Sequence, residues 1–167
     1  MKRRRLPFMA GPLSAVLALL LSSPFAVAAP PDAKTFHVVL TGLAEAPENV
    51  HRNADRGFAE VTFDRSDAEV CWQVQRLRLS DGEALPFMGH IHIAPRNVPG
   101  PIVVHLFGTG DGGVAPTSYP TTRVCRPIAP ALLDQILADP DQYYVNLHNT
   151  THPSGVVRGQ LQGGHGG

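Results

Sequence analysis

The sequence predicts an all-β domain, a sandwich or barrel with one short helix. Several short segments alternate apolar and polar residues with the period of two that is typical of strands. Turn residues are abundant between them, since the chain contains 16 glycines and 16 prolines. One segment alone, residues 130–138, carries a helical pattern. The chain has 167 residues, enough for one domain with a hydrophobic core. The strand order does not follow from these patterns.

The expected strands follow from alternation or from short apolar runs bounded by turn residues. Trp72 lies on the apolar side of its strand and is expected in the core. In the helix, Pro130 suits the first turn, and Asp139 followed by Pro140 ends it. The strands are expected at residues 36–41, 57–64, 69–77, 89–93, 102–107, 121–126, 143–148 and 156–161, and the helix presents Leu132, Leu133, Ile136 and Leu137 on one face.

The last two strands form a hairpin with a polar loop at residues 149–155, which is rich in Thr, Pro, Ser and Gly. Before the loop, Val145 and Leu147 face one side of the strand. His148 faces the other side, together with Tyr144 and Asn146.

The N-terminus has the layout of a secretory signal peptide over residues 1–28. Four basic residues at positions 2–5 precede an apolar run at 13–21 and the exit Ala-Val-Ala at 26–28. An uncleaved anchor is the alternative, but the apolar run is short for a membrane span. We therefore expect a periplasmic or secreted protein with no membrane insertion after cleavage. Residues 163–167 are expected to be a flexible Gly-rich tail.

The charge balance changes when the signal peptide is removed. The whole chain has 14 basic and 14 acidic residues. Cleavage removes four basic and no acidic residues, which leaves 10 against 14 and a net charge of −4. This charge argues against a nucleic-acid partner. The partner remains an unknown protein or a metal ion.

Two cysteines, Cys71 and Cys125, are present. In an exported protein an even number favours a disulfide. This bond would close a loop of about 55 residues and stabilise the fold by about 4 kcal/mol on the chain-entropy model. The alternative is a metal-binding or redox-active thiol.

Histidines are the candidates for chemistry. His90 and His92 form an H-x-H pair on a strand, so both rings leave the same face, while Ile91 and Ile93 leave the core side. His148 is likewise opposite the apolar residues of its own strand. Neutral imidazoles presented by neighbouring strands suit Cu or Zn. The prediction is a surface metal site on the non-core face.

Two further histidines are weaker candidates. His105 lies in an apolar strand, where a hydrogen-bonded structural role is the alternative, and His152 lies in the hairpin loop, from which it could reach the site. The H-x-H pair also has a structural interpretation, in which His90 and His92 pack against Tyr144 and Asn146 and only hydrogen-bond loop carbonyls. Arg158 is expected to tie down a loop or a carboxylate, and Gly159 to allow close packing.

Several reaction classes are excluded by missing motifs. The chain contains no G-x-x-x-x-G-K-[ST] phosphate loop and no G-x-S-x-G nucleophile elbow. The glycines of residues 108–113 are not followed by a predicted helix, so they do not form a dinucleotide-binding turn.

Four stretches, in this order and spacing, resemble the CHRD (chordin) domain, here the exported single-domain microbial type. They are LTGLAEAPE at 40–48, GFAEV at 57–61, GHIH with PGPIVVHL within 89–106, and YVNLHNTTHPSGVVRGQL at 144–161. The family often has Val-Pro-Pro after the glutamate near its start, where this chain has Ala46-Pro47-Glu48. This departure concerns that loop alone. The resemblance covers residues 36–162 and implies an immunoglobulin-like β-sandwich.

The favoured function is an exported binding module for a protein or a transition metal. One alternative is a small copper/zinc enzyme, because the H-x-H arrangement on a sandwich resembles the copper site of Cu,Zn superoxide dismutases. Such an enzyme would need a cation near the metal to steer an anion, and Arg96 and Arg158 are the nearest candidates in the sequence. The other alternative is a purely structural or interaction domain with no metal.

Overall fold

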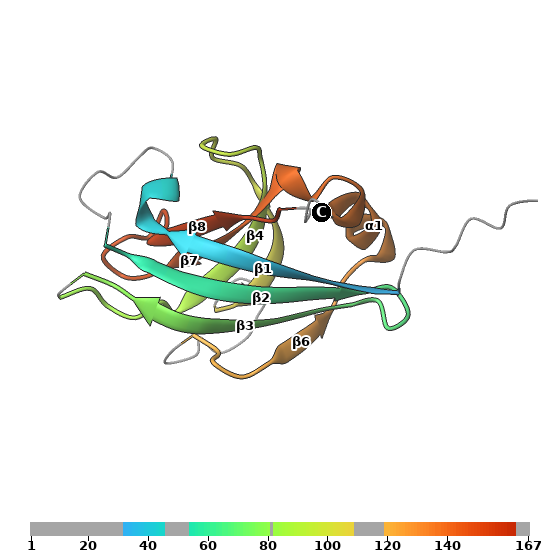
Figure 1. Ribbon diagram of the computed structural model, residues 1–167, viewed down its shortest axis with the longest axis horizontal. Helices are drawn as coiled ribbons and strands as arrows, with labels where there is room; N and C mark the ends of the chain where they lie inside the picture. The colour runs from blue at the N-terminus through green and yellow to red at the C-terminus, as the bar shows by residue number, and fades with distance from the viewer. Residues whose placement is uncertain (1–31, 46–53, 81, 109–118, 163–167) are drawn as a thin grey trace, which may run out of the picture. The chain divides into compact units, whose positions relative to one another are not determined.

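The computed structural model describes residues 32–45, 54–80, 82–108 and 119–162. The predicted signal peptide, 1–28, and the predicted tail, 163–167, lie outside the described residues. The predicted all-β class with one short helix is confirmed. The elements are β1 (Ala33–Thr41), η1 (Gly42–Ala44), β2 (Arg56–Asp64), β3 (Glu69–Arg78), β4 (Met88–Ile93), β5 (Ile102–Phe107), β6 (Val124–Pro127), α1 (Pro130–Ala138), η3 (Pro140–Gln142), β7 (Tyr143–His148) and β8 (Val157–Gln160) (Figure 1).

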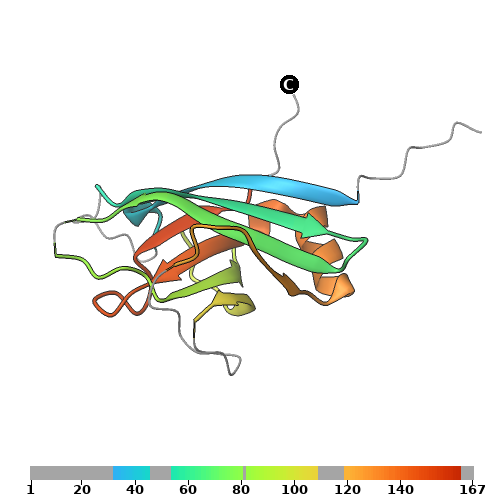
Figure 2. The same ribbon diagram turned by 90° about the horizontal axis from the view of Figure 1, so that it is seen from below.

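The eight strands form one antiparallel sheet in the order β5-β4-β7-β8-β1-β2-β3-β6. The sheet folds over so that two halves face each other, as Figure 2 shows. We call β5-β4-β7-β8 the first half-sheet and β1-β2-β3-β6 the second. They join where Thr41 of β1 pairs with Arg158 of β8. Across the opposite seam, the Arg126 guanidinium donates to the backbone carbonyl of His105. The result is a sandwich that is nearly closed into a barrel.

The joint between β8 and β1 depends on a glycine. A Cβ atom added to Gly159 would overlap the backbone oxygen of Val39 and the side chain of Val38. Any larger residue would therefore push β8 away from β1.

The hydrophobic core lies between the two half-sheets, because alternate residues of every central strand point inward. Trp72 is 3% exposed, so its predicted core position is confirmed. Ile93 was expected on the core side and is 37% exposed; that expectation is wrong, because β4 ends at this residue and the chain leaves the sheet. Fully buried core residues include Leu40, Val61, Phe63, Ile91, Leu133, Ile136, Val145, Leu147 and Leu161.

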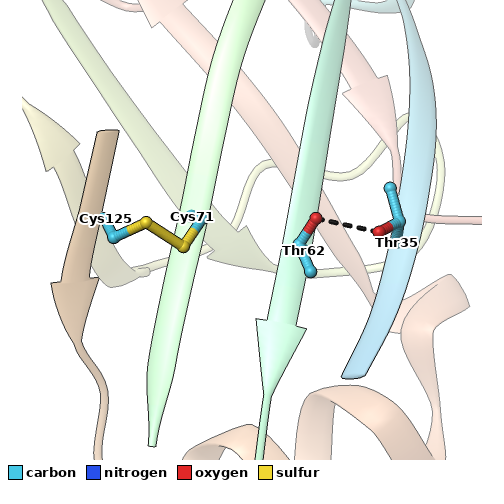
Figure 3. The surroundings of a disulfide bond; sticks show 4 residues. All are labelled: Thr35, Thr62, Cys71 and Cys125. Atoms are coloured by element: carbon cyan, nitrogen blue, oxygen red, sulfur yellow. Dashed lines mark hydrogen bonds between the residues drawn. A yellow bond between two sulfur atoms is a disulfide. The ribbon is translucent and has the colours of Figure 1, made fainter. Parts of the chain in front are cut away.

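The predicted disulfide is confirmed. Cys71 of β3 lies directly opposite Cys125 of β6, and their sulfur atoms are bonded (Figure 3). β6 is an edge strand with only four residues. It begins at Val124 rather than at residue 121 as predicted, since residues 121 and 122 form a bend. The covalent bond secures this short strand to the second half-sheet.

The helix α1 has the bounds that the sequence predicts. Pro130 occupies its first turn, where a missing N–H costs nothing. Leu133 and Ile136 are buried against the core. Among the described residues, no helix is long and apolar enough to cross a membrane.

Candidate metal centre

The three histidines come together because β4 pairs with β7. In this register Met88 lies opposite His148, His90 opposite Asn146, and His92 opposite Tyr144. Directly opposed residues of an antiparallel pair project from the same face. That face is the outer side of the first half-sheet, away from the core.

The imidazoles are close enough to share an ion. One nitrogen from each of His90, His92 and His148 lies within 4.8 Å of the other two. The Nδ1 of His90 is 3.0 Å from the Nε2 of His148. The ring of His92 has its centroid 5.7 Å from that of His90 and 5.9 Å from that of His148. We call these three residues the histidine trio.

The trio is buried, which corrects the prediction of surface histidines. The exposed fractions are 4% for His90, 7% for His92 and 5% for His148. Their side chains do leave the non-core face, but two loops fold back over that face. Gly100 of the β4–β5 loop and Pro153 of the β7–β8 loop place their carbonyl oxygens against the rings.

These carbonyl contacts determine which ring nitrogens carry protons. The Nδ1 of His92 is 2.9 Å from the oxygen of Gly100, and the Nδ1 of His148 is 3.0 Å from that of Pro153. A carbonyl oxygen can only accept, so both Nδ1 atoms carry the proton and both Nε2 atoms have a lone pair. Nε2 of His148 then accepts from Nδ1–H of His90.

The Nε2 atom of His92 is different. It is buried and has no hydrogen-bond partner within the described residues. A buried acceptor without a donor costs about 1–3 kcal/mol of desolvation, and such an atom is often explained by a bound ion or water. In metal sites, a ligating histidine commonly donates its other N–H to a carbonyl, which is the arrangement seen for His92 and His148.

Burial also keeps two of the rings uncharged. It lowers the pKa of His148 to about 4, against the smaller opposing effect of the bond to Pro153. Burial is also the largest cause of the lowered pKa of His92, to which the nearby positive charge of Arg158 adds. Both imidazoles are therefore neutral at physiological pH and can present a lone pair.

His105 and His152 lie outside the trio. His105 is half-buried on β5, and its ring meets the ring of His90 edge-on at 4.9 Å. The Nε2 of His152 is 2.9 Å from a carboxylate oxygen of Glu83, and its backbone N–H donates to the side chain of Asn149. Neither belongs to the group of described residues whose ligand atoms converge.

Arg158 holds the β4–β5 loop. Its exposed fraction is 2%, and its guanidinium donates to the carbonyls of Pro95 and Val98, each at 2.9 Å. The central carbon (Cζ) of this guanidinium lies 3.3 Å from the ring centroid of Tyr144. Burial lowers the pKa of Arg158 from its high ordinary value. Its neighbour in β8, Gln160, donates to the carbonyls of Ala94 and Asp141.

Sequence reasoning named Tyr144 only as a side chain against which His90 and His92 could pack, and it gave Gly100 no role at the site. Tyr144 stacks on His92 with ring centroids 4.8 Å apart and an interplanar angle of 8°, and its hydroxyl accepts the N–H of Gly100. The alternation of the hairpin strand did place Tyr144 on the face of His148. No local signal indicated Gly100, because its contact is made by a backbone atom.

The donor set limits the chemistry. Three imidazole donors suit Cu and Zn and are poor ligands for Mg or Ca, which prefer oxygen. A second converging group consists of Glu69, Cys71 and Cys125. Its two sulfurs are already joined in the disulfide, so they offer no thiolate.

Comparison with known proteins identifies the family. No match is found among curated proteins, and none is found among solved structures. Residues 36–161 match the CHRD domain, which is most of the 167-residue chain and includes every strand from β2 to β8 and most of β1. The chain belongs to the CHRD domain family.

Proposed function

We propose that this CHRD protein is an extracytoplasmic binding module that holds one Cu or Zn ion in the histidine trio. The observation that carries the proposal is the Nε2 of His92, a buried lone pair with no partner in the described residues. His92 is one of three histidines that each bring one imidazole nitrogen within 4.8 Å of the others. An ion at about 2.0–2.1 Å from each nitrogen would satisfy this lone pair. In the metal-free protein the Nδ1 proton of His90 points at Nε2 of His148, so ion binding requires His90 to carry its proton on Nε2 instead.

The proposed location outside the cytoplasm has two supports besides the predicted signal peptide. The chain belongs to the CHRD family, and it carries the Cys71–Cys125 disulfide. Disulfides persist in oxidising compartments and are rare in the reducing cytosol.

Binding is favoured over catalysis because of how the trio is enclosed. A dismutase-like enzyme would need a coordination position open to its substrate, whereas the three rings are at most 7% exposed. It would also need a cation directed at the metal. The guanidinium of Arg158 instead donates to the carbonyls of Pro95 and Val98.

The structural alternative explains part of the same geometry. The contacts between His92 and Gly100, and between His148 and Pro153, would hold the loops without any metal. This alternative leaves the desolvation of the His92 Nε2 uncompensated. The two interpretations therefore differ in whether the protein takes up an ion.

The experiment is metal analysis of protein exported to an oxidising compartment. Elemental analysis and titration with Cu or Zn alone should show one ion per chain in the wild type. The variant with both His90→Ala and His92→Ala should bind none at this site. His152→Ala is the matched control, because it removes a histidine outside the trio, and it should retain one ion.

Either of two results would overturn the proposal. Wild-type protein that takes up neither ion would establish the structural alternative. Equal metal content in the double variant and the wild type would place the ion elsewhere. X-ray absorption should show three imidazole nitrogens around the bound metal.

A further inference from the structure

Arg158 is linked to His92 of the trio by two sets of contacts, one through the β4–β5 loop and one through Tyr144. The guanidinium of Arg158 holds the β4–β5 loop through the carbonyls of Pro95 and Val98. The same loop brings Gly100 to His92, whose Nδ1–H donates to the Gly100 carbonyl at 2.9 Å.

The second set of contacts between Arg158 and His92 is made by Tyr144. The guanidinium of Arg158 lies over one face of the Tyr144 ring at 3.3 Å, and His92 stacks on this ring at 4.8 Å. The Tyr144 hydroxyl accepts the N–H of Gly100 at 3.1 Å. His92 is thus held by ring stacking and by its bond to the loop, and Arg158 contacts both supports.

We propose that Arg158 is a positioning residue for the metal site, which fixes the tautomer and orientation of His92 without touching the ion. The inference rests on the proposed function. With the loop held, the Gly100 carbonyl keeps the proton on Nδ1 of His92, and the buried Nε2 remains a bare lone pair with no partner in the described residues. Residues that orient metal-ligating histidines in this way typically contribute about 10- to 100-fold to metal affinity.

The shape of the side chain matters as much as its charge. A guanidinium is planar and carries donors on two terminal nitrogens, so Nη1 reaches Val98 while Nη2 reaches Pro95. It also stacks flat on an aromatic ring. Lysine presents a single ammonium, which cannot keep both carbonyls and the Tyr144 face in the same geometry.

The sharpest variant is therefore Arg158→Lys, which retains the positive charge. We expect its affinity for Cu or Zn to be lower by about 10- to 100-fold. Arg65→Lys is the matched control: it makes the same chemical change at the exposed pair between Arg65 and Asp134 and should bind as the wild type does. Val74→Ala, in the core of the second half-sheet, controls for a general loss of stability and should also bind normally.

A second readout follows the tautomer directly. Nitrogen-15 NMR of metal-free protein should show His92 protonated at Nδ1 in the wild type and in both controls. In Arg158→Lys we expect a mixture of the two neutral tautomers. A residue that served only to stabilise the fold would change neither this signature nor the affinity of folded protein.

The outcomes separate the inference from the proposed function. If the wild type binds no metal, the proposed function fails and this inference fails with it. If the wild type binds and folded Arg158→Lys has the same affinity and the same His92 tautomer, only the inference is wrong. Should Arg158→Lys not fold, Tyr144→Phe decides: it removes the acceptor for Gly100 N–H and keeps the ring. Weaker binding with tautomer mixing in this variant would support the inference, and unchanged binding would overturn it.

Discussion

The outer faces of the two half-sheets have the same alternating pattern but different surroundings. On the second half-sheet, the outward side chain of His37 is 79% exposed and lies 3.8 Å from Glu60. On the first, the outward His92 is 7% exposed and is covered by the β4–β5 loop. The comparison shows that a position on the non-core face of a strand does not determine exposure. The loops that return over the sheet do.

This difference has a chemical consequence. An exposed imidazole is solvated and can find water at both nitrogens. A buried imidazole needs a protein partner or an ion at each nitrogen, because water is excluded. The outer face of the first half-sheet therefore has the geometry of a metal-binding site, and the outer face of the second has that of an ordinary solvated surface.

The largest expected effect concerns the second half-sheet, whose edge depends on the disulfide. Replacing Cys71 and Cys125 together by serine should lower the free energy of unfolding by about 4 kcal/mol, because the bond closes a long loop in the unfolded chain. Urea denaturation of the variant and of oxidised wild type measures this. A loss below about 1 kcal/mol would show that β6 is held by its other contacts.

The next effect concerns the first half-sheet and depends on pH. In metal-free protein, folded His148 has its pKa lowered to about 4 from 6.5. Between these values the unfolded chain binds more protons, so stability is fully present above pH 6.5 and falls as the pH drops toward 4. The loss attributable to His148 is up to about 3 kcal/mol.

Urea denaturation at several pH values checks this expectation. His148→Asn should flatten the slope between pH 6.5 and 4. Val39→Ala, at an exposed position on the second half-sheet, removes no titratable group and should keep the wild-type slope. An equal slope in His148→Asn and wild type would assign the pH dependence to other groups.

A smaller effect is expected where the half-sheets join. Gly159→Ala adds a Cβ that would overlap the Val39 backbone oxygen. The main chain of β1 cannot move aside as easily as the end of a flexible side chain. We expect a loss of about 2 kcal/mol, as for overpacking in a core. Thermal unfolding measures it. Unchanged stability would mean that β8 can move away from β1 without loss of packing.

The smallest effect, at Val39, belongs to a pair of variants that tests the alternation itself. Val38 is 1% exposed and Val39, the next residue of β1, is 59% exposed. Val38→Ala should cost about 2 kcal/mol through the cavity it leaves, whereas Val39→Ala should change stability by less than about 0.5 kcal/mol. Similar losses for both variants would mean that another surface covers the outer face of the second half-sheet in solution.

Much of the site could be predicted from local pattern. Period two placed His90 and His92 on one face, and it placed His148 opposite the apolar residues of β7. A shared site also required β4 to lie close to β7, and the register shows that the two strands pair directly. His105 and His152 could not be sorted in this way, because their distances from the trio depend on the course of β5 and of the hairpin loop.

The sequence by itself determined the all-β class, the helix at 130–138 and the disulfide, because these follow from short-range periodicity, turn residues and cysteine count. The tertiary structure alone decided that the trio is buried and that its Nδ1 protons point at the carbonyls of Gly100 and Pro153. Carbonyl groups are common to every residue, so no side-chain pattern marks the ones that reach a site. Arg158 is visible in the sequence as a charge, but its contacts with Pro95 and Val98 span about 60 residues of chain and arise only when β8 and the β4–β5 loop meet on the same face.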